Sequence, residues 1–575
     1  MAAFFDAVTA SARKGTHERP RRHPARPRPG GRILVDQLLR HGVRTVYGVP
    51  GESYLAVLDA LHDSAVRMVV CRQEGGAAYM AEAYGKLTGR PGVCLVTRGP
   101  GASNALVGLH TAEQDGTPLL LCVGLVPRGH SDRFAFQEMD LRAVFGSVAK
   151  AVEVCADAAR LPEYLARAMA VAASGRPGPV VLGIPEDVLA DTASVPDAEP
   201  LPIPSGGVGE PELDRLARLL AQAERPLLFL GGSRWTEPAR EDLRAWAEAW
   251  ELPVAVDFRC QDLIPDDSPV HIGNFGYGRS PRLARRLAET DLLLCVGTAP
   301  GDVATEGYTL LDEAGTRIVQ VLPYDQPPGV LYRAELALLA TPEAFGAAVR
   351  RRLPAPEGPG PLPWSARTKR DRADRLDFRA PVHNEEDELD LGSCVEELDA
   401  RLPGDAVITF GAGNYSHWAQ RFLTYHAGTR QLGPRNGSMG YGLPAAVAAS
   451  IEYPGRRVVC FAGDGCFLMN GQELATAVGE GAAPLILVLE NGTYGTIRMH
   501  QERAYPGRVS GTALTNPDFA ALARAYGAFG EAVTATAEFA PALDRALAAV
   551  DAGRPALLAL RMARGRLGPE LRVAE

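Results

Sequence analysis

No run of apolar residues in the 575-residue sequence approaches the roughly 20 residues that a membrane-spanning helix needs. The N-terminus also lacks the basic start followed by a long apolar stretch that marks a secretory signal. We therefore expect no membrane segment. An excess of basic residues is missing as well, because the net charge is -9, so the composition gives no electrostatic footprint for nucleic acid.

The 9 cysteines include no CxxC pair, the spacing that is typical of zinc and redox sites. Most of them lie singly inside apolar runs, which indicates reduced core residues and a cytoplasmic location. What is present is a globular composition, with 46% hydrophobic and 22% charged residues. At roughly 150 residues per domain, the length suggests three or four units.

Three segments rich in proline, glycine or charge lack hydrophobic periodicity and divide the chain. They are residues 1–30, which are basic and proline-rich, residues 189–212 and residues 353–390. The expected organisation is a disordered basic extension over 1–30, an N-terminal domain over 31–190, a central domain over 212–352, a linker over 353–390, and a C-terminal domain over 391–565.

Short runs of Val, Ile and Leu alternate with longer stretches of helical period in each of the three expected domains. Examples are GVCLVT, RVVCFAG and PLILVLE. Continuous apolar strands separated by helices indicate mainly parallel sheets that are covered on both faces. The predicted fold class is therefore α/β, with three doubly wound domains, and ligands are expected beyond the carboxyl ends of strands.

Two such ends carry polar oxygen ligands. Asp464 stands between two glycines after RVVCFA, and Asn491 ends PLILVLE. A carboxylate, an amide oxygen, a main-chain carbonyl and phosphate oxygens form a ligand set that Mg²⁺ accepts, so the pair indicates a metal clamp on a diphosphate. The stretch FLMNGQELATAV after the glycines predicts a helix. The alternative is a tight turn followed by an unrelated strand-terminal asparagine.

About two dozen residues separate the GDG triplet from Glu490-Asn491, and this segment resembles the cofactor motif of thiamine diphosphate-dependent enzymes, in which an asparagine pair follows GDG. Glu490 stands where the family has the first asparagine. By this resemblance, the Mg²⁺ ligands are Asp464, Asn491 and the main-chain oxygen of Thr493. The cofactor-binding residues that it implies are Glu74, Gly437, Met439, Gly463, Asp464, Gly465, Cys466, Asn491, Thr493, Tyr494 and Gly495.

The resemblance extends over about residues 31–565 and is closest to the acetolactate synthase-like branch of the family. It includes residues 46–61, 71–105, 134–152 and 435–446, in the family's order. It implies a pyrimidine-binding first domain, a central domain and a diphosphate-binding third domain. Phe136 and Gln137 would line the active site, with Gln137 among the catalytic residues, and Gly437 and Met439 would meet the aminopyrimidine ring.

The same resemblance makes Glu74 the carboxylate that bonds the pyrimidine nitrogen and so favours the imino form of the cofactor. Without the surrounding motif, Glu74 would be an ordinary solvated helix glutamate. Since Glu74 belongs to the first domain and the metal motif to the third, the resemblance implies a homodimer or homotetramer with active sites at the subunit interface.

Departures from the synthase pattern fall where substrates are chosen. Thr496 and His500 replace a methionine and a tryptophan, and Ala299 stands in place of an arginine that would meet a second oxo acid. The segment around Ala299 helps to hold FAD in true synthases, which makes FAD doubtful here. His500 is either a solvated histidine or a catalytic group that relays a proton or binds an acceptor carboxylate. Arg98 is either structural or an anion contact.

The leading hypothesis is an acetolactate synthase-like transferase. It would use thiamine diphosphate and Mg²⁺ to decarboxylate a pyruvate-like 2-oxo acid and to transfer the acyl-anion unit to a carbonyl acceptor. One alternative is a decarboxylase or lyase that releases an aldehyde without ligation. Another is an inactive scaffold or regulatory homologue, which failure to bind the cofactor would support. The predicted partners are small molecules and further copies of the chain.

Overall fold

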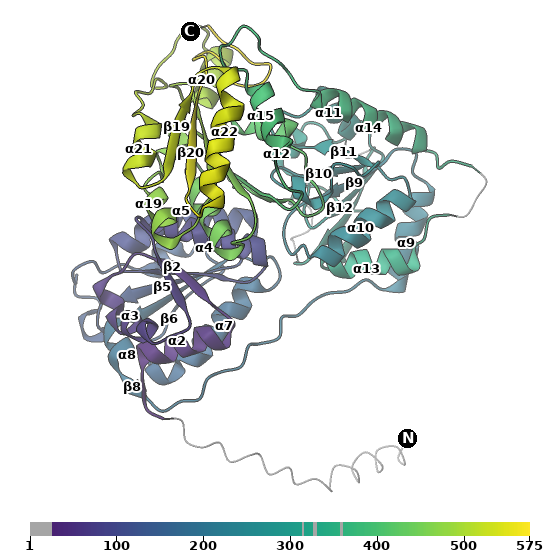
Figure 1. The fold of residues 1–575 in the computed structure, drawn as a ribbon. Coiled ribbons are helices and arrows are strands. Elements are labelled where there is room, and N and C mark those ends of the chain that lie inside the picture. The colour runs from purple at the N-terminus through teal and green to yellow at the C-terminus, as the bar shows by residue number, and fades with distance from the viewer. Residues whose placement is uncertain (1–25, 313–314, 326–329, 357–359, 575) are drawn as a thin grey trace, which may run out of the picture.

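The computed structural model describes residues 26–312, 315–325, 330–356 and 360–574. These residues form three α/β domains, each built on a six-stranded sheet in which all neighbouring strands run parallel. Figure 1 shows the first domain in purple at the lower left, the third in green and yellow above it, and the central domain in teal beside them. The predicted fold class is confirmed. Within the described residues, no helix is both long and apolar enough to cross a membrane.

The inner strands of the first sheet are buried on both faces because they are almost wholly apolar. All five residues of β4, for example, are buried. Its strands, in sheet order, are β3 (Arg67–Val70), β2 (Thr45–Gly48), β4 (Gly92–Val96), β5 (Leu119–Leu125), β7 (Pro179–Pro185) and β6 (Ala151–Val154). The helices that cover it are α2 (Gly30–Arg40), α3 (Leu55–His62), α4 (Glu74–Thr88), α5 (Pro100–Asp115), α6 (Leu141–Phe145), α7 (Leu161–Ala173) and α8 (Glu186–Ala190).

The prediction of a disordered extension over residues 1–30 is wrong at the C-terminal end of that segment. Arg28–Pro29 form a short strand, β1, that pairs antiparallel with β8 (Thr192–Ala193), and Gly30 begins α2. Arg28 also forms ion pairs with Asp36 and Asp197, which tie this segment to the body of the domain. The remainder of that prediction, residues 1–25, lies outside the described residues.

The central domain repeats the arrangement around its own core. Its strands, in sheet order, are β11 (His271–Asn274), β10 (Val254–Val256), β9 (Pro226–Leu230), β12 (Leu292–Val296), β13 (Arg317–Leu322) and β14 (Leu336–Leu339). Its helices are α9 (Glu210–Ala221), α10 (Glu237–Ala249), α11 (Pro281–Ala288), α12 (Asp302–Thr305) and α13 (Pro342–Arg352).

The segment predicted as a linker over 353–390 contains a helix, α14 (Ser365–Arg379). Hydrophobic periodicity does not indicate this helix, because α14 is held largely by charged side chains. Arg375 and Arg379 both pair with the buried Asp266 of the central domain, whose carboxylate also accepts from the backbone N–H of Tyr425 in the third domain. The linker therefore fastens the central domain to the third.

The third sheet carries the motif at Asp464. Its strands, in sheet order, are β16 (Arg430–Leu432), β15 (Val407–Phe410), β17 (Val458–Gly463), β18 (Leu485–Glu490), β20 (Ala556–Arg561) and β19 (Phe529–Val533). Its helices are α15 (Leu391–Asp399), α16 (Ser416–Phe422), α17 (Gly442–Glu452), α18 (Asp464–Phe467), α19 (Glu473–Glu480), α20 (Gly495–Ala504), α21 (Phe519–Ala525) and α22 (Thr536–Asp551). The single helix predicted after Asp464 is instead two, because turns around Asn470 and Gly471 separate α18 from α19.

The first and third domains share one hydrophobic core, built where α4 packs against α17. Both helices are rich in alanine and glycine, and small side chains allow two helices to approach closely. Tyr79 of α4 meets Tyr441 edge-on, with ring centroids 5.4 Å apart. Figure 1 shows α4 and α5 at this boundary, next to α19.

Candidate active site

A cavity of about 220 Å³ opens at the carboxyl ends of β15, β17 and β18 in the third domain. This is the edge of a parallel sheet at which ligands bind. Its lining includes all of the predicted cofactor-binding residues except Glu74. They are Gly437, Met439, Gly463, Asp464, Gly465, Cys466, Asn491, Thr493, Tyr494 and Gly495.

Asp464 lines this cavity, and its side chain is buried, with 3% exposed. Its Oδ1 accepts from the backbone N–H of Gly465 at 2.8 Å, and its Oδ2 accepts from the backbone N–H of Gly492 at 2.7 Å. The side-chain amide of Asn516 donates to the same Oδ2 at 2.9 Å. These donors fix the carboxylate between the ends of β17 and β18.

The flanking glycines are needed because aromatic rings press against this turn, and neither has a positive φ. A Cβ at Gly463 would lie 2.7 Å from the ring of Tyr415, and a Cβ at Gly465 would lie 2.4 Å from the ring of Tyr494. A side chain at either position would displace a ring that borders the cavity. The sequence motif thus reflects close packing as well as a sharp turn.

Asn491 and Thr493 line the same cavity as Asp464. Asn491 Oδ1 accepts from the backbone N–H of Thr493 at 3.2 Å, and its Nδ2 donates to the carbonyl of Arg566 at 3.2 Å. The amide oxygen therefore faces back toward the loop that carries Thr493. Glu490, just before it, is partly buried, and burial raises the pKa of its carboxyl.

Helix α4 holds the loop that carries Gly437 and Met439. The hydroxyl groups of Tyr79 and Ser438 lie 2.6 Å apart, and the Tyr79 hydroxyl also donates to the carbonyl of Met439 at 3.4 Å. One turn further, the Tyr441 hydroxyl donates to Glu82 at 2.5 Å, and Thr117 donates to the other oxygen of Glu82 at 2.7 Å. Burial raises the pKa of Glu82, and the neighbouring Lys86 opposes that shift.

Glu74 and Gln137 do not line this cavity in their own chain. Glu74 begins α4, and one of its oxygens accepts from the side-chain amide of Asn104 at 2.9 Å. Gln137 lies next to Gly99, in a loop where Asp132, Phe134 and Gln137 itself all have positive φ. The structure thus separates the two predicted groups of the first domain from the Asp464 cavity.

The three residues predicted to lie near the substrates, Thr496, His500 and Ala299, lie in different surroundings from one another. Thr496 lines the cavity. Its hydroxyl accepts a hydrogen bond from the backbone N–H of Asn414 and donates one to the side-chain oxygen of Asn414, each at 3.0 Å. His500 lies exposed on α20 and is not part of the lining. Ala299 borders a separate crevice together with Gly232 and Arg435.

Arg98 is the further position for which the sequence left two interpretations open. Arg98 is buried and pairs with Glu52 and Glu186, so of its two interpretations the structural one fits.

Several lining residues were not found from the sequence. The loop after β15 contributes Gly413, Asn414 and Tyr415. The Tyr415 hydroxyl donates to the Cys466 sulfur at 3.1 Å, and the backbone N–H of Gly440 donates to the same sulfur at 3.2 Å. A signal was available, because β15 is followed by Gly-x-Gly at 411–413. Three other lining residues, Met562, Arg566 and Leu567, come from the C-terminal end of the chain.

Comparison with known proteins identifies the class to which this fold and cavity belong. The N-terminal, central and C-terminal domain models of thiamine pyrophosphate enzymes match residues 28–144, 213–349 and 411–560. The chain belongs to this family of thiamine pyrophosphate enzymes. Its third domain is of the thiamine pyrophosphate-binding type, as the motif at Asp464 predicted.

Within the family, the chain is similar to acetolactate synthases. It is 33% identical to the acetolactate synthase large subunit of Parasynechococcus marenigrum, over 88% of this chain and 83% of that protein. It is 32% identical to the acetolactate synthase isozyme 2 large subunit of Escherichia coli, over 90% and 93%. Acetolactate synthase 2, chloroplastic, of Nicotiana tabacum is 30% identical over 86% and 75%. The predicted family is confirmed.

Proposed function

We propose that the protein is a carboligase that uses thiamine diphosphate to join the acyl unit of a pyruvate-like 2-oxo acid to a carbonyl acceptor, with acetolactate as the leading product. The observation that carries the proposal is the single cavity in which ten predicted cofactor residues meet around Asp464. The similarity to acetolactate synthases over most of their length supports the substrate class.

Mg²⁺ is proposed as the ion that joins the cofactor to this cavity. Asp464 offers a carboxylate, Asn491 an amide oxygen and Thr493 a main-chain oxygen, and all three residues line one space. Hard oxygen donors of this kind, completed by diphosphate oxygens, suit Mg²⁺. The donor set therefore fits the ion that the family motif implies.

Thiamine diphosphate, when bound, supplies a nucleophilic carbon and an electron sink for the loss of CO₂. The chain's own contribution is to hold and orient. Met439 is proposed to fix the conformation of the bound cofactor. The hydroxyl of Tyr79 holds the loop that carries Met439 by its hydrogen bond with Ser438. Glu74 is proposed to share a proton with the pyrimidine ring, and Gln137 and His500 to act near the substrate.

A homodimer or homotetramer with active sites at the subunit interface is proposed because Glu74 lies outside the Asp464 cavity of its own chain. Large apolar side chains are left exposed in the same regions. Phe134 is 103% exposed and Phe136 77%, both in the loop of Gln137, and Leu468 and Met469 follow α18. Exposed apolar side chains of this kind are typical of surfaces that a partner covers. A second copy of the chain, bound by isologous contacts, would cover them.

We propose that FAD is doubtful as a cofactor of this chain, because Ala299 stands in the segment that helps to hold FAD in true synthases. The ends of β9 and β12, adjacent strands of the central sheet, lie close together, because a Cβ on Gly232 would lie 1.8 Å from the carbonyl oxygen of Gly297. Beside them, the Asp257 carboxylate is held by Thr298 at 2.7 Å and by Arg435. An absorption spectrum of the purified protein tests this inference, since retained flavin bands would contradict it.

A reducing, cytoplasmic location is also proposed. All nine cysteines lie within the described residues, and each is buried and free of disulfides. That pattern is typical of proteins kept in a reducing compartment.

The test of the reaction is product analysis by proton NMR. The protein is incubated with thiamine diphosphate, Mg²⁺ and pyruvate, with and without 2-oxobutyrate. Acetolactate or acetohydroxybutyrate is the expected product. Acetaldehyde alone would make the protein a non-ligating decarboxylase, and failure to bind the cofactor would make it an inactive homologue.

A further inference from the structure

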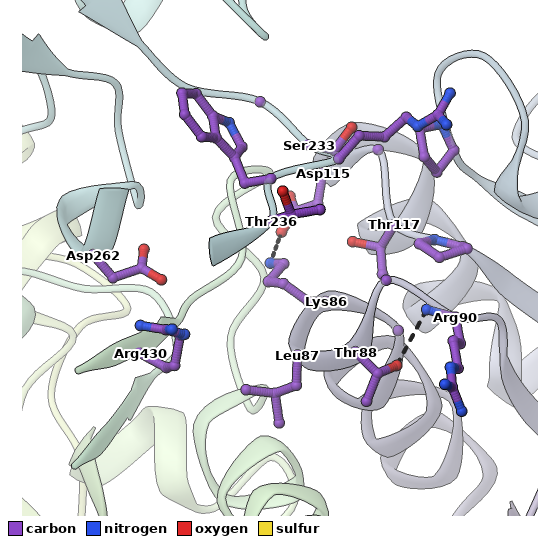
Figure 2. A pocket seen from close by; sticks show the side chains of 18 of the residues that line it. Lys86, Leu87, Thr88, Arg90, Asp115, Thr117, Ser233, Thr236, Asp262 and Arg430 are labelled. Atoms are coloured by element: carbon purple, nitrogen blue, oxygen red, sulfur yellow. Dashed lines mark hydrogen bonds and ion pairs between the residues drawn. The ribbon is translucent and has the colours of Figure 1, made fainter. Parts of the chain in front are cut away.

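Lys86, in the last turn of α4, is a charged residue that packing has largely removed from water. Figure 2 shows its ion pair with Asp115, the last residue of α5, as a dashed line. The Asp115 carboxylate is fully buried, and the equally buried carboxylate of Glu82 lies 3.3 Å from Lys86 Nζ. Burial alone would lower the pKa of Lys86, but the two carboxylates outweigh it and raise the pKa above its ordinary value. The lysine is therefore charged.

The other hydrogen bonds of this ion pair cross to the third domain. Lys86 Nζ donates to the carbonyl of Gly433 at 3.1 Å, and Asp115 Oδ1 accepts from the backbone N–H of Arg435 at 2.8 Å. Gly433 comes directly after β16, where the chain leaves the third sheet. One ion pair of the first domain thus holds both a carbonyl and an N–H at the start of the following loop.

The loop over residues 433–440 depends on such support because its glycines leave the backbone free. Gly437 and Gly440 both have positive φ, of 71° and 81°, a conformation that glycine adopts without strain. Gly437 and Met439 line the cofactor cavity. The place of these two residues is therefore set by contacts that the loop makes with the first domain.

A contribution to stability alone is a weak explanation of a buried ion pair. Taking two charges out of water costs about as much as their attraction returns, so apolar replacement of both partners is often neutral for stability. Replacement of only one partner leaves an unpaired charge and is strongly destabilising. The double variant Lys86→Met with Asp115→Leu removes both bonds to the loop and both charges. Glu82 keeps the hydroxyl groups of Thr117 and Tyr441 as its donors.

We propose that Lys86 and Asp115 are positioning residues for the cofactor, which fix the places of Gly437 and Met439 against the pyrimidine ring. The inference rests on the proposed function, in which thiamine diphosphate fills the cavity of Asp464. Neither Lys86 nor Asp115 lines that cavity, so the pair acts through the loop. A binding site loses affinity when the contacts that support its lining residues are loosened.

The test is isothermal titration of the unmodified protein and the double variant with thiamine diphosphate and with inorganic pyrophosphate, each in excess Mg²⁺. The loop meets the pyrimidine side of the cofactor, whereas Asp464 and Asn491 hold its diphosphate. We expect the affinity for thiamine diphosphate to fall by roughly tenfold or more, and the affinity for pyrophosphate to stay the same. Lys369→Met, at an exposed lysine of α14, is the matched control and should bind both probes normally.

Chemical denaturation shows whether the double variant folds as stably as the unmodified protein. An unchanged affinity for thiamine diphosphate in the folded double variant overturns the inference. An equal loss of affinity for both probes also overturns it, because general damage to the third domain would act on both. If the unmodified protein itself does not bind thiamine diphosphate, the proposed function fails and the inference fails with it. Asp115→Asn, judged by the same two affinities, decides the matter if the double variant does not fold.

Discussion

The hydroxyl of Tyr441 donates a hydrogen bond of 2.5 Å to the carboxylate of Glu82, and both side chains are fully buried. The bond joins α4 of the first domain to the start of α17 in the third. It also stands next to the loop of Gly437 and Met439, which lines the cofactor cavity. This hydrogen bond between two domains therefore also helps to hold the loop that lines the candidate active site.

Replacement of Tyr441 by Phe would leave one oxygen of a buried carboxylate without its donor. We expect a loss of about 1–3 kcal/mol in the free energy of unfolding, because the desolvated acceptor gains no substitute partner. Chemical denaturation of the unmodified protein and the variant measures this. Tyr505→Phe, at an exposed tyrosine, is the control. Equal stability of Tyr441→Phe and the unmodified protein would contradict the assignment.

Replacement of Asp464 by Asn should abolish cofactor binding at working concentrations. The variant loses the charged metal ligand and also turns an amide toward the N–H donors of Gly465 or Gly492. We expect thiamine diphosphate affinity in the presence of Mg²⁺ to fall by roughly 100-fold, measured by calorimetry. Asp544→Asn, at an exposed carboxylate of the same domain, serves as the matched variant and should bind normally.

Mixing two inactive variants tests whether active sites are shared between subunits. In a dimer of Glu74→Gln with Asp464→Asn, one site contains both substitutions and the other contains neither. Random exchange of subunits should therefore restore about a quarter of the unmodified activity. Each variant alone should remain inactive after the same treatment. Absence of any recovery, once subunit exchange has been verified, would place both residues in one chain's site.

Replacement of His500 by Ala tests the proposed substrate role of an exposed histidine on α20. We expect kcat to fall while thiamine diphosphate affinity stays the same, because His500 does not line the cofactor cavity. Arg503→Ala, an exposed neighbour on the same helix, should leave kcat unchanged. An unaltered product profile and unaltered kinetics in His500→Ala would remove this residue from the mechanism.

His271 makes stability depend on pH. Burial lowers its pKa from 6.5 to about 4, the charge of Arg375 lowers it further, and Asp266, 3.4 Å away, acts in the opposite direction. A lowered pKa in the folded state means that the stability contribution is complete above pH 6.5 and is lost as pH falls toward 4. The loss should reach about 3 kcal/mol, seen as a falling melting temperature.

His271→Gln removes the titrating group from this buried position. Its melting temperature should fall less steeply than that of the unmodified protein over the same acidic range. His62→Gln, at an exposed histidine of α3, should keep the unmodified pH dependence. Parallel curves for His271→Gln and the unmodified protein would assign the acid sensitivity to other groups.

The cofactor residues of the third domain could be predicted because their motifs are local. Asp464 and Asn491 end neighbouring strands, so strand periodicity alone brings them to one edge of the sheet. Arg566 was missed because it reaches the cavity from the C-terminal end of the chain, beyond the family motifs, whereas the Gly-x-Gly after β15 could have indicated the loop of Tyr415. The separation of Glu74 from Asp464 within one chain could be predicted from their places in different domains. The pairing of Arg435 with Asp257 could not, because it depends on how the domains pack, which no local sequence pattern encodes.

The helix α14 shows a different limit. Its sequence is strongly charged, so hydrophobic periodicity could not reveal it, and the segment was expected to be irregular. Its contacts include ion pairs with Asp266, a residue about a hundred positions away. Short-range signals identify elements that pack through apolar stripes and miss those held by distant charges.

The shared core of the first and third domains has a consequence for how the chain is made. Tyr79 and Ser438, which meet at this boundary, are 359 residues apart. At typical rates of synthesis, roughly 20–70 s pass between their appearances. During that time the α4 face of the first domain has no partner, while its opposite face, around α2 and α7, can already pack. The nascent chain therefore exposes an unpacked apolar surface to chaperones. The central domain can fold before the first domain has completed its core.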